Sequence, residues 1–196
     1  IKLFLNVSIK NRKVLRGKCN YYLYINHTQE VGDAFIPPFI TRYKRPFYVV
    51  NKANLGIPVL GKLLPLLGAI VIPDGIHDML KFREALKFYG DKHPIIIYPE
   101  AHVWPYYTKI RPFKNSAFQL AIEEKKEVYS ATTTYKKSTI FKKPKIVVYV
   151  DGPFYVDNFL TKKEKSNALA KIVRDKMIER SKMSNVEYVI YKKKDN

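Results

Sequence analysis

The sequence predicts a single α/β domain with a mixed, mostly parallel central sheet flanked by helices. Two observations lead to this class. Short segments rich in β-branched and aromatic residues alternate with stretches of helical periodicity, and several of these segments are continuously apolar, which suits a sheet covered on both faces. The 196 residues contain no repeat and no low-complexity linker, so we assign residues 1–196 to one domain.

Four short segments have the composition of strands. They are Tyr21–Ile25, Pro46–Val50, Ile95–Tyr98 and Ile146–Val150. Two helices are expected between them. The first is capped by Asp74 and ends at Gly90, and its periodic positions are Ile76, Met79, Leu80, Arg83 and Leu86. The second runs from about Ser116 to Glu127, and its inner side consists of Ala117, Leu120 and Ala121.

A C-terminal helix is expected at about residues 161–182. Thr161 and Glu164 have the spacing of a capping box, which fixes its start. Its apolar stripe consists of Leu169, Ile172, Val173 and Met177.

An apolar run from Leu55 to Pro73 is nearly long enough to span a membrane, which takes about 20 residues. Three prolines, three glycines and Lys62 interrupt it and would leave its backbone poorly satisfied in lipid. We therefore predict a broken helix followed by a buried strand, in a segment that can lie on a membrane without crossing it.

Charge is the most unusual feature of the composition. The chain has 36 Lys and Arg residues against 17 Asp and Glu residues, a net charge of +19, which predicts an anionic partner. A phosphate-bearing ligand, a membrane surface and a nucleic acid all qualify. A basic nucleic-acid-binding domain without catalysis is therefore an alternative, and TYKKSTIFKKPK at 134–145 fits it. Cys19 is the only cysteine, which excludes a disulfide framework and a zinc finger within one chain.

His27 is the strongest catalytic candidate. It follows the apolar strand Tyr21–Ile25, and α/β folds place ligands where strands end. If a helix begins here, either Glu30 or Asp33 could hold the Nδ1–H group and leave Nε2 free as a general base. A His–carboxylate pair that only caps a helix is the alternative. His77 and His93 have no companion motif and are expected to be structural or exposed.

The loop Tyr98–Phe113 gathers a second set of polar side chains after the strand Ile95–Tyr98. It contains Glu100, His102, Lys109 and Arg111. Together with Lys114, its two cations could meet phosphate oxygens. The alternative is an aromatic-rich loop that packs on the core with its basic residues in water. No GxSxG, P-loop, GxGxxG or HExxH pattern is present in the sequence.

The order of motifs from Tyr21 to Val156 resembles the glycerolipid acyltransferase family of the 1-acylglycerol-3-phosphate (lysophospholipid) type. Asn26, His27 and Asp33 resemble its first motif, in which four residues rather than five separate the His from the Asp. Tyr98-Pro99-Glu100 resembles the Phe-Pro-Glu of its third motif. Weaker similarities are GAIVIPDG at 68–75, Phe113-Lys114 with Ala117-Phe118, Val128–Thr134, and Asp151-Gly152-Pro153.

The resemblance implies transfer of a fatty acyl group from acyl-CoA or acyl carrier protein to the hydroxyl group of a lysophospholipid-like acceptor, without a cofactor or a metal. It implies His27 as the general base and Asp33 as its support, with Glu30 as the alternative orienting carboxylate. The substrate-binding residues expected are Glu100, His102, Lys109, Arg111 and Lys114. It also implies a peripheral enzyme on the cytoplasmic face of a membrane, whose basic surface meets anionic lipid rather than nucleic acid.

Two positions depart from the family pattern. The second motif usually ends in Arg, where this chain has Asp74, and the Arg of the third motif is replaced by Val103. In the family those arginines are implicated in holding the phosphate of the acceptor. We expect Lys109 and Arg111 to supply positive charge from another direction.

Overall fold

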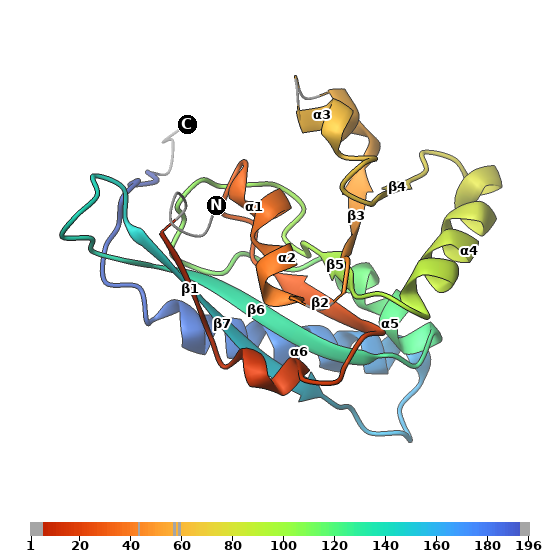
Figure 1. Ribbon diagram of the computed structural model, residues 1–196. Coiled ribbons are helices and arrows are strands. Elements are labelled where there is room, and N and C mark those ends of the chain that lie inside the picture. Colours follow the sequence, from red (N-terminus) through yellow and green to blue (C-terminus); the bar gives the residue numbers. More distant parts are fainter. Residues whose placement is uncertain (1–5, 43, 57, 59, 193–196) are drawn as a thin grey trace.

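One sheet organises the molecule (Figure 1). The computed structural model describes residues 6–42, 44–56, 58 and 60–192. Within these residues, seven strands form the sheet in the order β1-β7-β6-β2-β5-β3-β4. The β6–β7 pair is antiparallel and every other neighbouring pair is parallel. The predicted class, an α/β domain with a mixed and mostly parallel sheet, is confirmed.

The strands are β1 (Val7–Lys10), β2 (Tyr21–Ile25), β3 (Phe47–Asn51), β4 (Ala69–Ile72), β5 (Ile95–Ile97), β6 (Glu127–Lys136) and β7 (Lys145–Phe154). The α-helices are α1 (Gly32–Phe35), α2 (Pro37–Ile40), α3 (Leu60–Leu63), α4 (Met79–Gly90), α5 (Gln119–Glu123) and α6 (Lys162–Ser181). Short 3₁₀ turns are η1 (Arg12–Leu15), η2 (Lys52–Gly56), η3 (Ile76–Asp78) and η4 (Asn115–Phe118).

The predicted strands all occur in the sheet. Tyr21–Ile25 is β2 with the expected bounds, and Ile146–Val150 forms the middle of the longer β7. β6 is a strand that was not expected from the sequence. β6 contains the run Thr132–Thr134, which lacks an apolar pattern, yet all three threonines are buried.

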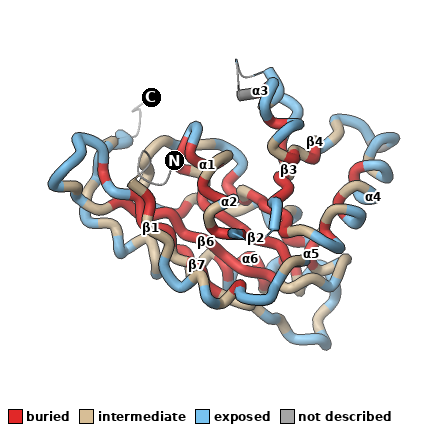
Figure 2. Tube along the Cα trace, in the orientation of Figure 1, coloured by how far each residue is buried: buried red, intermediate tan, exposed pale blue. Residues whose placement is uncertain are grey.

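Helices cover both faces of the sheet (Figures 1 and 2). Successive residues of β2 point to opposite faces. Tyr22 and Tyr24 join the core beneath α4, α5 and α6, whereas Leu23 joins the core of the other face together with Ile36 and Ile40 from the α1–α2 segment. Because both faces are covered, β2 and β5 are buried along their whole length, as continuously apolar strands require.

The start of α4 differs from the prediction. η3 precedes the helix, α4 begins at Met79, and Asp78 occupies the N-cap position without a side-chain hydrogen bond to the helix backbone. Asp74 does not cap this helix. It lies before η3 and forms an exposed ion pair with Lys52, with 2.8 Å between Nζ and Oδ2.

The buried side of α4 also differs from the prediction. Phe82 and Leu86 are buried, whereas Leu80 is 66% exposed and Arg83 pairs with Glu123 at the surface. The predicted apolar stripe was counted from Ile76, but Ile76 belongs to η3 and not to the helix. The side chain of Ile76 lies outside the described residues.

The segment predicted as one helix from Ser116 to Glu127 is divided. η4 and α5 occupy its first part, and Ala117, Leu120 and Ala121 pack inward as expected. The helix ends at Glu123 because the chain reverses at Lys125, whose φ is 51°, and Glu127 then begins β6.

The C-terminal helix α6 has the predicted capping box between Thr161 and Glu164. Leu169, Val173 and Met177 are buried, four residues apart along one line of the helix. Ile172 is 40% exposed, so its assignment to the stripe is wrong. It lies at the flank of the buried line, where the helix meets solvent.

The apolar run contains a short helix, α3, and the strand β4, as predicted (Figure 1). Gly68, with φ of 91°, turns the chain into β4. β4 is not a fully buried strand, because it lies at the edge of the sheet: Ile70 is buried and Ile72 is 38% exposed. Ile57 and Val59 lie outside the described residues. Over the part of the chain that the structure describes, none of the helices combines the length and apolar character needed to cross a membrane.

Candidate active site

The segment that carries His27 begins where β2 ends, at the side of the sheet formed by the carboxyl ends of β2, β5 and β6, which we call the site edge. β2 is parallel to both β5 and β6, so the carboxyl ends of these strands meet there. The side chain of Asn26 continues the pairing of β2 with β6. Its Oδ1 accepts from the N–H of Thr133 at 2.7 Å, and its Nδ2 donates to the carbonyl of Thr133 at 3.1 Å. A buried amide therefore fixes the position from which the chain turns to His27.

His27 and Asp33 form a hydrogen-bonded pair. The distance between His27 Nδ1 and Asp33 Oδ2 is 2.6 Å, and the two side chains are 19% and 5% exposed. Asp33 lies in the first turn of α1, and the same oxygen accepts from the N–H of Gln29 at 2.9 Å. Because a carboxylate can only accept, a neutral imidazole carries its proton on Nδ1, and its Nε2 keeps a lone pair.

Glu30 is not the partner of His27. It is exposed and forms neither a hydrogen bond nor an ion pair with the imidazole. The expectation that either carboxylate could hold the imidazole assumed a helix that starts at His27, but residues 26–31 form an irregular turn and α1 begins at Gly32. This turn is tight, because a Cβ added at Gly32 would lie 2.9 Å from the Cβ of Gln29.

Tyr98, the residue after β5, contacts both members of the pair. Its ring stacks on the imidazole of His27, with centroids 4.5 Å apart, and its hydroxyl donates to the backbone carbonyl of Asp33 at 2.5 Å. Burial raises the pKa of the Asp33 carboxyl above its ordinary value, while the hydrogen bond from His27 opposes this shift. The site thus holds a buried carboxylate against one imidazole of fixed orientation.

Glu100 and Arg111 form a buried ion pair next to His27. Glu100 Oε2 accepts from Arg111 Nη2 at 2.9 Å and from the backbone N–H of His27 at 3.0 Å, and its Oε1 accepts from the backbone N–H of Arg111 at 2.8 Å. The Glu100 side chain is 0% exposed. Both carboxylate oxygens bond to the protein, so the structure places Glu100 against the backbone of His27, and its contact with a substrate stays a prediction.

The other expected substrate-binding residues do not converge on one point. The Arg111 side chain is only 11% exposed, and its Nη2 also donates to the carbonyl of His102. His102, Lys109 and Lys114 are exposed, and their side chains form no hydrogen bond or ion pair with other described residues. Within the described ranges, no group of three or more His, Cys, Asp or Glu side chains could hold a metal ion.

Four residues that sequence reasoning missed hold the turn after His27. Gln29 Nε2 donates to the hydroxyl of Tyr135 at 2.7 Å, and that hydroxyl donates to Thr28 Oγ1 at 2.8 Å. The N–H of Tyr106 donates to the carbonyl of Thr28 at 2.9 Å. Tyr135 lies more than a hundred residues away in sequence, on β6, so no local pattern could have linked it to this turn.

A comparison with known families now identifies the chain. The family model described as Acyltransferase matches residues 6–136, which include the His27–Asp33 pair, the Glu100–Arg111 pair and the whole of β6. The chain belongs to the acyltransferase family. The resemblance inferred from the motifs is confirmed, and the chain is an enzyme rather than the basic nucleic-acid-binding domain that its charge also allowed.

A solved structure has the same fold as this acyltransferase. It is the crystal structure of PlsC, the 1-acyl-sn-glycerophosphate (LPA) acyltransferase of Thermotoga maritima, with a TM-score of 0.65 and 15% sequence identity. The similarity covers 92% of this chain and 74% of that one. At this identity the comparison shows the fold alone. A search of curated protein sequences finds no significant match.

Proposed function

We propose that this acyltransferase moves a fatty acyl group from a thioester, either acyl-CoA or acyl carrier protein, to the hydroxyl group of a lysophospholipid-like acceptor. The observation that carries the proposal is the 2.6 Å hydrogen bond between His27 Nδ1 and Asp33 Oδ2 in a chain of this family. The similar fold of PlsC, which is a 1-acyl-sn-glycerophosphate acyltransferase, supports the acceptor class.

The proposed reaction needs one general base. His27 Nε2 removes the proton of the acceptor hydroxyl while that oxygen attacks the thioester carbonyl, and Asp33 stabilises the imidazolium that forms. The tetrahedral intermediate then expels the thiolate, which takes the proton from His27. The products are an ester and a free thiol, and no covalent bond to the enzyme forms.

The position of the base is set by groups that take no part in the reaction. Glu100 holds the backbone N–H of His27, and Tyr98 supports the imidazole ring. Because these contacts exist before a substrate arrives, the base needs no rearrangement to act.

We further propose that the enzyme works at the cytoplasmic face of a membrane as a peripheral protein. Support comes from the apolar arm, defined as residues 55–72 with α3 and β4, which exposes Leu55, Leu63, Leu66 and Ile72. Exposed apolar side chains close to Lys62 and Lys52 suit an interface with anionic lipid.

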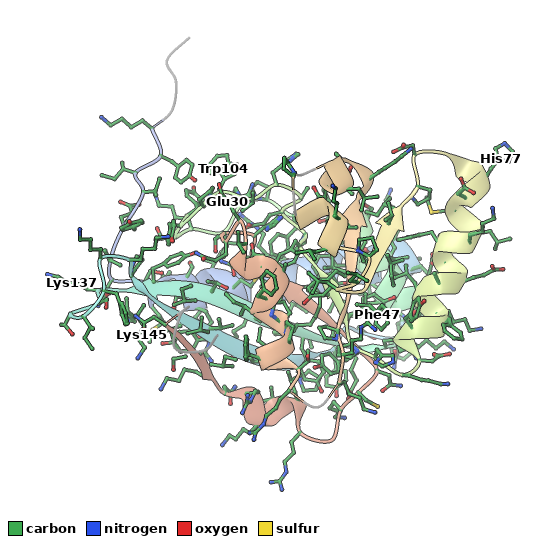
Figure 3. The ribbon with its side chains drawn as sticks, turned by 45° about the horizontal axis from the view of Figure 1, so that its top comes forward. Glu30, Phe47, His77, Trp104, Lys137 and Lys145 are labelled. Carbon is green, nitrogen blue, oxygen red and sulfur yellow. The ribbon has the colours of Figure 1, made fainter. Side chains whose placement is uncertain are left out.

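The decisive experiment compares His27→Ala with His77→Ala. His77 is exposed before α4, far from Glu30 and Trp104 at the site edge (Figure 3). Purified proteins are incubated with acyl-CoA and a panel of lysolipids, and the products are identified by mass spectrometry. Loss of a general base should lower turnover by about 100- to 10,000-fold. A folded His27→Ala protein with the turnover of His77→Ala would refute the mechanism.

A further inference from the structure

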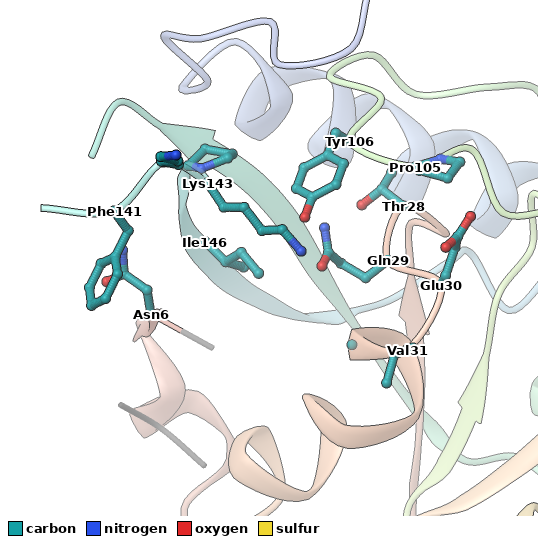
Figure 4. A pocket seen from close by; sticks show the side chains of 13 residues that line it. Asn6, Thr28, Gln29, Glu30, Val31, Pro105, Tyr106, Phe141, Lys143 and Ile146 are labelled. Carbon is teal, nitrogen blue, oxygen red and sulfur yellow. The ribbon is translucent and has the colours of Figure 1, made fainter. Parts of the chain in front are cut away.

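A cavity of about 440 Å³ lies beside the turn that follows His27 (Figure 4). One wall is the turn itself, residues 28–32, and a second is Pro105-Tyr106. The third wall is the end of the loop between β6 and β7, residues 141–144. Because β6 is parallel to β2 and antiparallel to β7, this loop lies at the same edge of the sheet as His27.

The charge of the cavity is positive. Lys142 and Lys143 line it, and Glu30 is the one acidic residue among the described residues of its wall. The side chain of Lys143 extends into the space between the loop and Gln29, while Glu30 lies at the far side, beside Pro105 (Figure 4). Neither lysine forms an ion pair with any described residue.

The residues that the sequence suggests for phosphate binding lie outside this cavity. Arg111 faces the carboxylate of Glu100. Lys109 and Lys114 are exposed and unpaired among the described residues, but they do not line the cavity. The cations of the cavity itself are Lys142 and Lys143, and no described carboxylate pairs with either of them.

Neutral donors in the cavity favour an oxyanion. The hydroxyl of Tyr106 points toward the amide of Gln29 and the end of Lys143 (Figure 4). Tyr106 has φ of 59°, a conformation that residues other than glycine rarely adopt. Its N–H bonds to Thr28, and its ring contacts Tyr135, with centroids 5.3 Å apart. The surrounding contacts hold the strained residue in place, as is common at binding sites.

We propose that this cavity binds a phosphate group of a substrate, with the Lys143 ammonium as its main ligand and Lys142 as a second cation. The inference rests on the proposed function, in which either substrate can bring phosphate: the acceptor through its headgroup, or the donor through its coenzyme or carrier. An ammonium group and a hydroxyl converging on a cavity suit a phosphate of either source.

The kinetic test uses Lys143→Gln, Lys142→Gln and a control, Lys137→Gln, on the same loop but outside the cavity. Each protein is assayed with lysophosphatidate and with monoacylglycerol as acceptors, and with acyl-CoA and acyl-N-acetylcysteamine as donors. Losing one charge-assisted hydrogen bond should raise KM for one phosphate-bearing substrate by about fivefold to tenfold. KM for its phosphate-free counterpart should stay unchanged, and the affected pair identifies the source of the phosphate.

A binding test keeps this inference separate from the proposed function. Calorimetry measures binding to the wild-type protein and to Lys143→Gln. Glycerol 3-phosphate is compared with glycerol, and coenzyme A is compared with pantetheine. We expect one phosphate compound to bind and to lose about fivefold affinity in the variant, even if no acyl transfer is detected. The inference is overturned if neither compound binds, or if Lys143→Gln and Lys137→Gln give the same constants in both tests.

Discussion

The site edge and the apolar arm lie in one sheet but are built in opposite ways. At the site edge, the charged side chains of Asp33 and Glu100 are buried, that of Arg111 is 11% exposed, and all three are bonded to other protein groups. In the apolar arm, large apolar side chains are in solvent, and Leu66 is 73% exposed. The difference matches the two proposed tasks, in which the site edge would hold His27 ready as a base and the arm would offer its apolar surface to lipid.

Asp33→Asn breaks the site edge at its most sensitive contact. The amide keeps the size of the carboxylate but lacks its charge and can donate to Nδ1, which moves the imidazole proton to Nε2. We expect kcat/KM to fall by about 100- to 10,000-fold. Glu30→Gln is compared through kcat, because Glu30 is exposed and forms no hydrogen bond with His27 but lines the proposed phosphate cavity. A larger loss in Glu30→Gln would mean that the wrong carboxylate has been assigned.

The stability of Asp33→Asn should change in the opposite direction from its activity. Burial raises the folded-state pKa of Asp33 above its unfolded value, so ionisation of this group opposes folding. The contribution of Asp33 is therefore present at low pH and is lost as pH rises through the raised pKa. Urea unfolding should show equal stabilities in acid and a relative gain for Asp33→Asn at neutral pH. A relative loss at neutral pH would show that the hydrogen bonds outweigh desolvation.

Arg111→Ala breaks the buried ion pair of the site edge. It leaves the Glu100 carboxylate, which is 0% exposed, without a counter-ion. Breaking a buried pair in this way costs about 3–5 kcal/mol of unfolding free energy. Activity should fall for every acceptor, because Glu100 holds the backbone of His27. Lys109→Gln, an exposed change in the same loop, should stay within about 0.5 kcal/mol of wild type. An unchanged stability in Arg111→Ala, with KM altered only for phosphorylated acceptors, would instead make Arg111 a substrate ligand.

Leu66→Ser tests the apolar arm. Stability should change by less than about 0.5 kcal/mol, because the side chain is exposed. Binding to anionic vesicles, measured by co-sedimentation at high salt, should weaken by about tenfold if one leucine enters the interface. Phe159→Ser is the control: Phe159 is 98% exposed, and it follows β7, whose end lies at the opposite edge of the sheet from His27. Equal vesicle binding by both variants and wild type would remove the arm from the membrane contact.

The sequence predicted those parts of the fold that depend on local patterns. Apolar runs gave β2 and β5, and the spacing of Thr161 and Glu164 gave the start of α6. The sequence did not predict the features that depend on tertiary contacts. Nothing local to Thr132–Thr134 shows that β6 is a buried strand between β2 and β7, and nothing local to Asp74 shows that it pairs with Lys52 instead of capping α4.

The site shows the same division. A histidine followed by two carboxylates at a strand end was enough to find the pair, and the family motif favoured Asp33, which the structure places against His27. The roles of Glu100 and Arg111 could not be read from their types, because an acid and a cation in one loop can face a ligand or each other. Burial decides this, and burial depends on the strands that surround the loop.

The turn between His27 and Asp33 also shows where this motif tolerates insertion. Its two ends are anchored independently: Asn26 is tied to β6 through Thr133, and Asp33 belongs to α1. The middle of the turn is not anchored in this way: the side chains of Glu30 and Val31 are exposed on the wall of the cavity and form no hydrogen bond with described residues, and Val31 is 58% exposed. One residue more than the four of the family motif can therefore be accommodated as an outward bulge, without changing the distance between base and carboxylate.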